Sequence, residues 1–124
     1  MRILVVEDDE DFARLVGITL QREGYQVAMA VNGRKALEHI ELAPIEEKPD
    51  LIVMDLMMPE IDGIEALSRL KASESTAHIP VLMLTAIDTD DEVLQAWKTG
   101  VNYYLTKPVD PFELVACIKS LFED

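Results

Sequence analysis

The sequence DLIVMDLMMPEIDG occupies residues 50–63 and contains the clearest structural signal in the chain. Its apolar run, Leu51–Met54, is short, unbroken and rich in branched side chains, and it ends abruptly at Asp55. A run that is apolar on both faces is typical of a strand inside a parallel sheet, where helices cover both sides. The stretch therefore predicts a buried strand with a carboxylate at its carboxyl end.

Similar runs recur along the chain, at Ile3–Val6 and Val81–Leu84, with weaker ones at residues 26–31 and 102–105. Between them the apolar residues follow helical spacing. The five stripes are Phe12, Leu15, Val16 and Thr19; Ala36, Leu37 and Ile40; Ile64, Leu67 and Leu70; Val93, Ala96 and Trp97; and Leu114, Cys117, Ile118 and Leu121. Five strands alternating with five helices predict an α/β fold with a doubly wound parallel sheet and right-handed crossovers.

The sequence also predicts where several helices begin and end. Gly24 and Gly100 supply the residue type that favours a helix end, and Thr89 to Glu92 match a capping box. Asp110 followed by Pro111 predicts a capped start for the last helix. Residues 43–49 carry no pattern and are expected to be loop.

Composition excludes several classes of function. The 124 residues form one predicted domain, 1–124, and 24 acidic against 11 basic side chains give a formal charge of −13. This charge argues against direct nucleic-acid binding, because phosphates need a basic face. The apolar runs are too short to span a membrane, and the N-terminus lacks the layout of a secretion signal. The single cysteine fits a reducing compartment, so we expect a soluble cytoplasmic protein.

Polar residues follow the carboxyl ends of the predicted strands. Asp8 follows the first strand, Asp55 the third, Thr85 the fourth and Lys107 the fifth. In a doubly wound sheet of order 2-1-3-4-5 the first and third strands are neighbours, and ligands bind beyond their carboxyl ends. We therefore expect Asp8 and Asp55 to converge, with Thr85 beside them and Lys107 at the rim.

This set of residue types favours phosphoryl chemistry. Converging carboxylates repel unless a cation neutralises them, and a set of oxygen ligands fits Mg²⁺ best. A metal ion and the Lys107 ammonium would neutralise phosphoryl oxygens, while the Asp55 carboxylate could act as the nucleophile. The Thr85 hydroxyl could donate a hydrogen bond to one of those oxygens.

Four segments together carry a family resemblance: ILVVEDD at the start, DLIVMDLMMPEIDG in the middle, then IPVLMLTA and YLTKP. In this order, each after a predicted strand, they make the whole chain resemble the response-regulator receiver domains of two-component signalling, the CheY-like superfamily. The resemblance implies the flavodoxin-like (βα)5 fold.

The resemblance also implies roles for individual residues. Asp55 becomes the phosphoacceptor, Asp8 a direct Mg²⁺ ligand and Glu7 a ligand through water, and the backbone carbonyl of Met57 would be a third protein ligand. Thr85 and Lys107 would hold the phosphoryl oxygens. Tyr104 falls at the family's aromatic switch position, and a cis peptide bond is expected before Pro108.

The implied function is a phosphorylation switch rather than a turnover enzyme. Asp55 would receive its phosphoryl group from a histidine kinase or a histidine phosphotransfer protein. The domain would then bind a downstream protein target or output domain through the fourth helix, fifth strand and fifth helix. The same face is a candidate homodimer interface, and no membrane partner is expected.

Two other classes remain as alternatives. A haloacid-dehalogenase-like phosphatase would place a second aspartate two residues after the nucleophile, and Met57 stands there instead. A receiver-like interaction module that is never phosphorylated would be signalled by a missing site residue, and none is missing.

Overall fold

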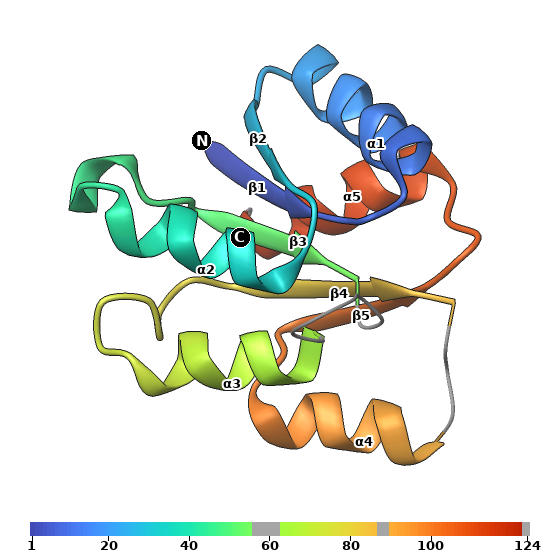
Figure 1. The fold of residues 1–124 in the computed structure, drawn as a ribbon. Coiled ribbons are helices and arrows are strands. Elements are labelled where there is room, and N and C mark those ends of the chain that lie inside the picture. The colour runs from blue at the N-terminus through green and yellow to red at the C-terminus, as the bar shows by residue number, and fades with distance from the viewer. Residues whose placement is uncertain (56–62, 87–89, 123–124) are drawn as a thin grey trace.

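A computed structural model describes residues 1–55, 63–86 and 90–122 of the chain. Five strands and five α-helices alternate, with one short 3-10 helix (Figure 1). The strands are β1 (Arg2–Val6), β2 (Gln26–Ala30), β3 (Leu51–Met54), β4 (Val81–Thr85) and β5 (Tyr103–Thr106). The helices are α1 (Glu10–Arg22), α2 (Gly33–Leu42), α3 (Gly63–Ala72), α4 (Asp90–Thr99) and α5 (Pro111–Phe122), and the 3-10 helix spans Ile45–Glu47.

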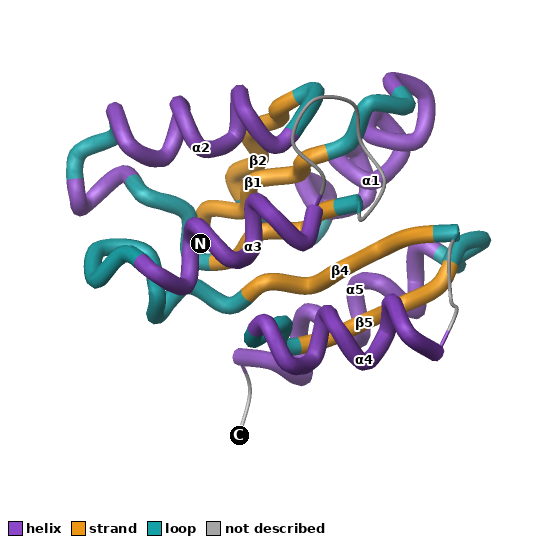
Figure 2. Tube along the Cα trace, turned by 60° about the horizontal axis from the view of Figure 1, so that its bottom comes forward, coloured by secondary structure: helices purple, strands orange, loops and turns teal. Residues whose placement is uncertain are grey.

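The strands form one parallel sheet in the order β2-β1-β3-β4-β5. Helices α1 and α5 cover one face, and α2, α3 and α4 cover the other (Figures 1 and 2). This arrangement confirms the predicted doubly wound, flavodoxin-like (βα)5 fold. The central position of β1 and β3 brings their carboxyl ends side by side, with Val6 in register with Met54.

The core has two layers, one on each face of the sheet. Alternate side chains of β1 and β3 point to opposite faces, so Leu4 and Ile52 pack beneath α2, α3 and α4, whereas Ile3 and Leu51 pack beneath α1 and α5. Every residue of β3 is buried. Burial on both faces explains why this strand reads as an unbroken apolar run.

Helix ends agree with most of the sequence signals. The Asp110 carboxylate accepts a hydrogen bond from the Phe112 amide at 2.7 Å, so α5 begins at Pro111 with the predicted cap. Gly24 and Gly100 have φ values of 92° and 114°, a region that glycine enters at little cost, and both follow a helix as predicted. The Thr89 end of the predicted capping box lies outside the described residues.

Two expectations need correction. Residues 43–49 are not plain loop, because Ile45–Glu47 form a turn of 3-10 helix. β5 spans Tyr103–Thr106 and so begins one residue later than predicted. The Asn102 side-chain oxygen accepts a hydrogen bond from the Val81 amide and so caps the start of β4. Among the described residues, no helix has both the length and the apolar character needed to cross a bilayer.

Candidate functional site

Three carboxylates converge at the carboxyl ends of β1 and β3. Hydrogen bonding continues one residue beyond each strand: the Glu7 amide donates to Ala30 O at 3.0 Å, and the Asp55 amide donates to Val6 O at 3.1 Å. These bonds fix the backbone from which the side chains project. One carboxylate oxygen from each of Glu7, Asp8 and Asp55 lies within 4.8 Å of the other two.

Lys107 reaches this cluster from the segment that follows β5. Its Nζ donates to Glu7 Oε1 at 2.9 Å and to Asp55 Oδ2 at 3.1 Å. The Glu7 and Asp55 side chains are 4% and 9% exposed, and that of Lys107 is 19% exposed. One ammonium thus bridges two buried carboxylates from neighbouring strands. Charges buried to this extent interact far more strongly than a surface ion pair.

The electrostatics of the cluster favour an added cation. The pKa of Glu7 is raised to about 7, because burial and the negative charge of Asp55 raise it more than the hydrogen bond from Lys107 lowers it. Burial lowers the pKa of Lys107, but its hydrogen bonds to Glu7 and Asp55 and their negative charge outweigh this and raise it above the ordinary value. One ammonium does not compensate three carboxylates. An all-oxygen ligand set of this kind suits a hard divalent ion such as Mg²⁺.

The structure locates the other predicted site residues with different degrees of detail. Thr85 ends β4, next to β3, and its backbone pairs with Thr106 of β5; its side chain is not among those described. Tyr104 is half-buried and packs against the core on the side of α2, α3 and α4. The Lys107–Pro108 peptide bond is cis, as the resemblance led us to expect. Met57 lies outside the described residues.

Sequence reasoning missed two contributions from residues 9–12. Asp9 caps α1, since its Oδ1 accepts a hydrogen bond from the Phe12 amide at 3.1 Å. The Phe12 ring lies under the Lys107 ammonium, with Nζ 4.5 Å from the ring centroid. Phe12 was assigned only to the apolar stripe of its helix. No local motif links it to a lysine 95 positions along the chain, and only the fold brings the two together.

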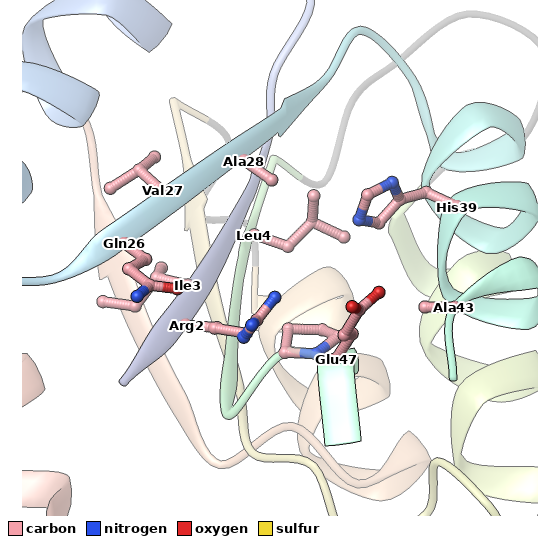
Figure 3. Close-up of a pocket in the computed structure, with 10 residues that line it drawn as sticks. Arg2, Ile3, Leu4, Gln26, Val27, Ala28, His39, Ala43 and Glu47 are labelled. Carbon is pink, nitrogen blue, oxygen red and sulfur yellow. The ribbon is translucent and has the colours of Figure 1, made fainter. Parts of the chain in front are cut away.

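A separate cavity of about 220 Å³ lies at the opposite end of the sheet, where β1 and β2 begin (Figure 3). It is lined by residues at the amino ends of β1 and β2, in α2 and in the segment after α2, among them Arg2, His39 and Glu47. None of the acidic cluster lines it, and the length of β1 separates the two places. Doubly wound sheets bind ligands at the carboxyl ends of their strands, so the acidic cluster is the better candidate site.

Comparison with known families agrees with this geometry. Residues 3–119 match the family model of the response regulator receiver domain. The chain belongs to this family. Receiver domains are parts of two-component systems, and they act as signalling switches rather than as conventional enzymes.

Individual receiver-containing proteins show the same similarity. The chain is 42% identical over 120 residues to the DNA-binding dual master transcriptional regulator RpaA of Synechocystis, covering 97% of this chain and 48% of that protein. It is 39% identical over 119 residues to the phosphate regulon regulator PhoB of Pseudomonas aeruginosa, covering 96% and 50%. This receiver domain therefore spans about half the length of these curated relatives.

Solved structures match the receiver fold along the whole chain. A putative response regulator from Chloroflexus aurantiacus has a TM-score of 0.88 at 32% identity, covering 99% of this chain and 98% of that one. The chemotaxis protein CheY4 of Vibrio cholerae has a TM-score of 0.87 at 28% identity, covering 96% of each chain.

Proposed function

We propose that this receiver domain is phosphorylated on Asp55 in a reaction that needs Mg²⁺. The phosphoryl group would come from a histidine kinase or a histidine phosphotransfer protein. The observation that carries the proposal is a cluster in which Lys107 bridges the buried Glu7 and Asp55 carboxylates. The exposed Asp8 places a carboxylate oxygen within 4.8 Å of both. At the carboxyl ends of the strands this arrangement supplies a nucleophile in Asp55, a cation in the Lys107 ammonium and a site for a hard metal ion.

In the proposed step an Asp55 carboxylate oxygen attacks phosphorus, an O–P bond forms, and the bond from phosphorus to the donor's imidazole nitrogen breaks. The freed imidazole keeps the electron pair and takes a proton from water. Lys107 holds one phosphoryl oxygen through its ammonium, and Thr85 donates its hydroxyl to another. Glu7, Asp8, Asp55 and the Met57 carbonyl would hold Mg²⁺. The ion would offset the negative charge of the phosphoryl oxygens when bound.

Phosphorylation would change partner binding through α4, β5 and α5. The phosphoryl group offers charge-assisted hydrogen bonds only to an arrangement in which Thr85 has moved toward it and Tyr104 has turned inward, so it shifts the population toward that state. The partner would be a downstream protein or an output domain. We also propose a cytoplasmic location, supported by the single buried Cys117, which fits a reducing compartment.

The test is intact mass spectrometry after incubation with acetyl phosphate, with Mg²⁺ or with EDTA. We expect a gain of one phosphoryl group that needs the metal ion. Asp55→Asn should remove the gain, whereas Asp11→Asn, which changes an exposed carboxylate in the first turn of α1, should leave it intact. No gain in the wild type would instead favour an interaction module that is never phosphorylated.

A further inference from the structure

Besides the two carboxylates, Lys107 contacts the ring of Phe12, which has no part in the proposed function. Its Nζ lies 4.5 Å from the centroid of the Phe12 ring, a distance within the range of a cation–π interaction. Phe12 is half-buried and packs against the core between the sheet and helices α1 and α5. Its ring therefore has packing partners in the core besides the lysine.

The three neighbours match what an ammonium can bind. A lysine ammonium carries three N–H donors. Two contact carboxylates, Glu7 Oε1 at 2.9 Å and Asp55 Oδ2 at 3.1 Å. Among the described residues, the face of the Phe12 ring is the third neighbour that the structure gives this ammonium. We propose that Phe12 is a positioning residue that holds the Lys107 ammonium in place for phosphoryl transfer.

The ring differs from the two carboxylates in what happens to it during the proposed reaction, on which this inference rests. Asp55 would form a bond to phosphorus, and Glu7 would be drawn toward a metal ion, so both contacts to Lys107 would weaken. An aromatic ring forms no bond to phosphorus and offers none of the oxygen ligands that Mg²⁺ takes, so neither event uses up its contact with the lysine. Phe12 would thus be the constant partner of the lysine.

Local structure explains why Phe12 is available for this role. The Asp9 cap fixes the first turn of α1, and the Phe12 amide itself donates to that cap. The ring is thereby set one turn beyond the acidic residues at the end of β1. A single six-residue segment, residues 7–12, supplies two of the three carboxylates in the acidic cluster, the helix cap and the aromatic face.

The first test needs no phosphorylation. Protons that lie over an aromatic face are shifted upfield in an NMR spectrum, so the ε-methylene protons of Lys107 should resonate upfield of those of the other lysines. Lys107→Arg assigns the signal, and Phe12→Leu should return it to the ordinary position. Ordinary shifts in the wild-type protein would overturn the proposed contact, whatever the outcome of the phosphorylation experiment.

The second test measures the effect on the reaction. Fluorination of a phenylalanine ring weakens its attraction for cations with little change of shape. We expect 3,4,5-trifluorophenylalanine at position 12 to lower the maximum rate of labelling by acetyl phosphate about fivefold, equivalent to about 1 kcal/mol. The Mg²⁺ concentration for half-maximal rate should not change, because fluorination alters the attraction of the ring for Lys107 and leaves the proposed carboxylate ligands unaltered. The same analogue at Phe122, at the far end of α5, is the matched control.

Rescue separates positioning from packing. Phe12→Tyr keeps the aromatic face and should label at close to the wild-type rate, whereas Phe12→Leu keeps most of the volume and should be as slow as the fluorinated protein. Equal rates for the fluorinated and natural rings would overturn the proposal. If wild-type protein shows the upfield shift but is not labelled, the proposed function fails while the contact stands.

Discussion

Lys107 and Lys71 lie at opposite ends of the sheet, and each places its ammonium among several oxygen atoms. The partners of Lys107 are the carboxylates of Glu7 and Asp55. Those of Lys71 are neutral: Nζ donates to Ile79 O at 2.9 Å, to Ala77 O at 3.2 Å and to Asn102 Oδ1 at 3.3 Å. The comparison therefore separates the effect of burial from the effect of partner charge.

The two pKa values move in opposite directions. Burial lowers the pKa of Lys71, and its neutral partners do not reverse the effect. Burial also lowers the pKa of Lys107, but the two carboxylates raise it above the ordinary value. Lys71 ties the end of α3 to the starts of β4 and β5, and its aliphatic stem passes Gly100. Partner charge, rather than burial, distinguishes the lysine with a proposed chemical role from the structural one.

The largest expected effect is on phosphorylation. Lys107→Met should lower the rate of Asp55 labelling by acetyl phosphate at least about 100-fold, the scale found when a donor that stabilises transition-state charge is removed. Lys71→Met should label within about twofold of the wild type. Both rates are measured by intact mass spectrometry at saturating Mg²⁺. A similar loss of labelling rate in both variants would mean that the charge of a lysine's partners does not decide whether it takes part in phosphorylation.

The next effect is on the free energy of unfolding, and it concerns Lys71. Lys71→Met leaves three carbonyl oxygens without their shared donor, and we expect it to lower the free energy of unfolding by about 2 kcal/mol. Urea denaturation followed by far-UV circular dichroism measures the change. Lys98→Met, an exposed lysine in the last turn of α4, should change stability by less than about 0.5 kcal/mol. Equal midpoints for the two variants would contradict a structural role for Lys71.

The roles of these two lysines were not equally predictable from sequence. Lys107 follows a strand within two residues and precedes a proline, so topology predicted it at the rim of the crevice that holds Asp8 and Asp55. The structure instead brings its ammonium between Glu7 and Asp55. Lys71 looks like any lysine at the end of an amphipathic helix, because its three acceptors come from turns whose backbone direction no local pattern specifies. The same holds for Phe12, whose contact with Lys107 depends on the rotation of α1 about its axis. Periodicity and strand ends thus predicted the doubly wound parallel sheet and the acidic cluster, and the family resemblance implied the strand order. They did not predict contacts set by helix rotation or by oxygen atoms in loops.

A smaller effect tests the excess of negative charge in the acidic cluster at the carboxyl ends of β1 and β3. A ligand at about ten times its Kd stabilises a protein that binds it only when folded by about 1.4 kcal/mol. We therefore expect about 10 mM Mg²⁺ to raise the thermal midpoint of the wild type and of Lys71→Met by the same amount, if its Kd is about 1 mM. Asp8→Asn removes a proposed ligand and should abolish most of this rise, and Asp11→Asn should keep it. A rise that persists in Asp8→Asn would place the ion elsewhere.

The smallest effect concerns the contacts between Asn102, Lys71 and the start of β4. Asn102 Oδ1 accepts hydrogen bonds from the Val81 amide at 2.9 Å and from Lys71 Nζ at 3.3 Å, so it joins the start of β4 to the end of α3. A double-mutant cycle of Asn102→Ala and Lys71→Met should give a coupling energy of about 1 kcal/mol, because the two side chains share one hydrogen bond. The cycle of Asn102→Ala with Lys107→Met should be additive within about 0.5 kcal/mol, since their polar atoms share no partner among the residues that the structure describes. Coupling of similar size in both cycles would mean that the two ends of the sheet are energetically linked, and the contrast between the two lysines would then be one of degree.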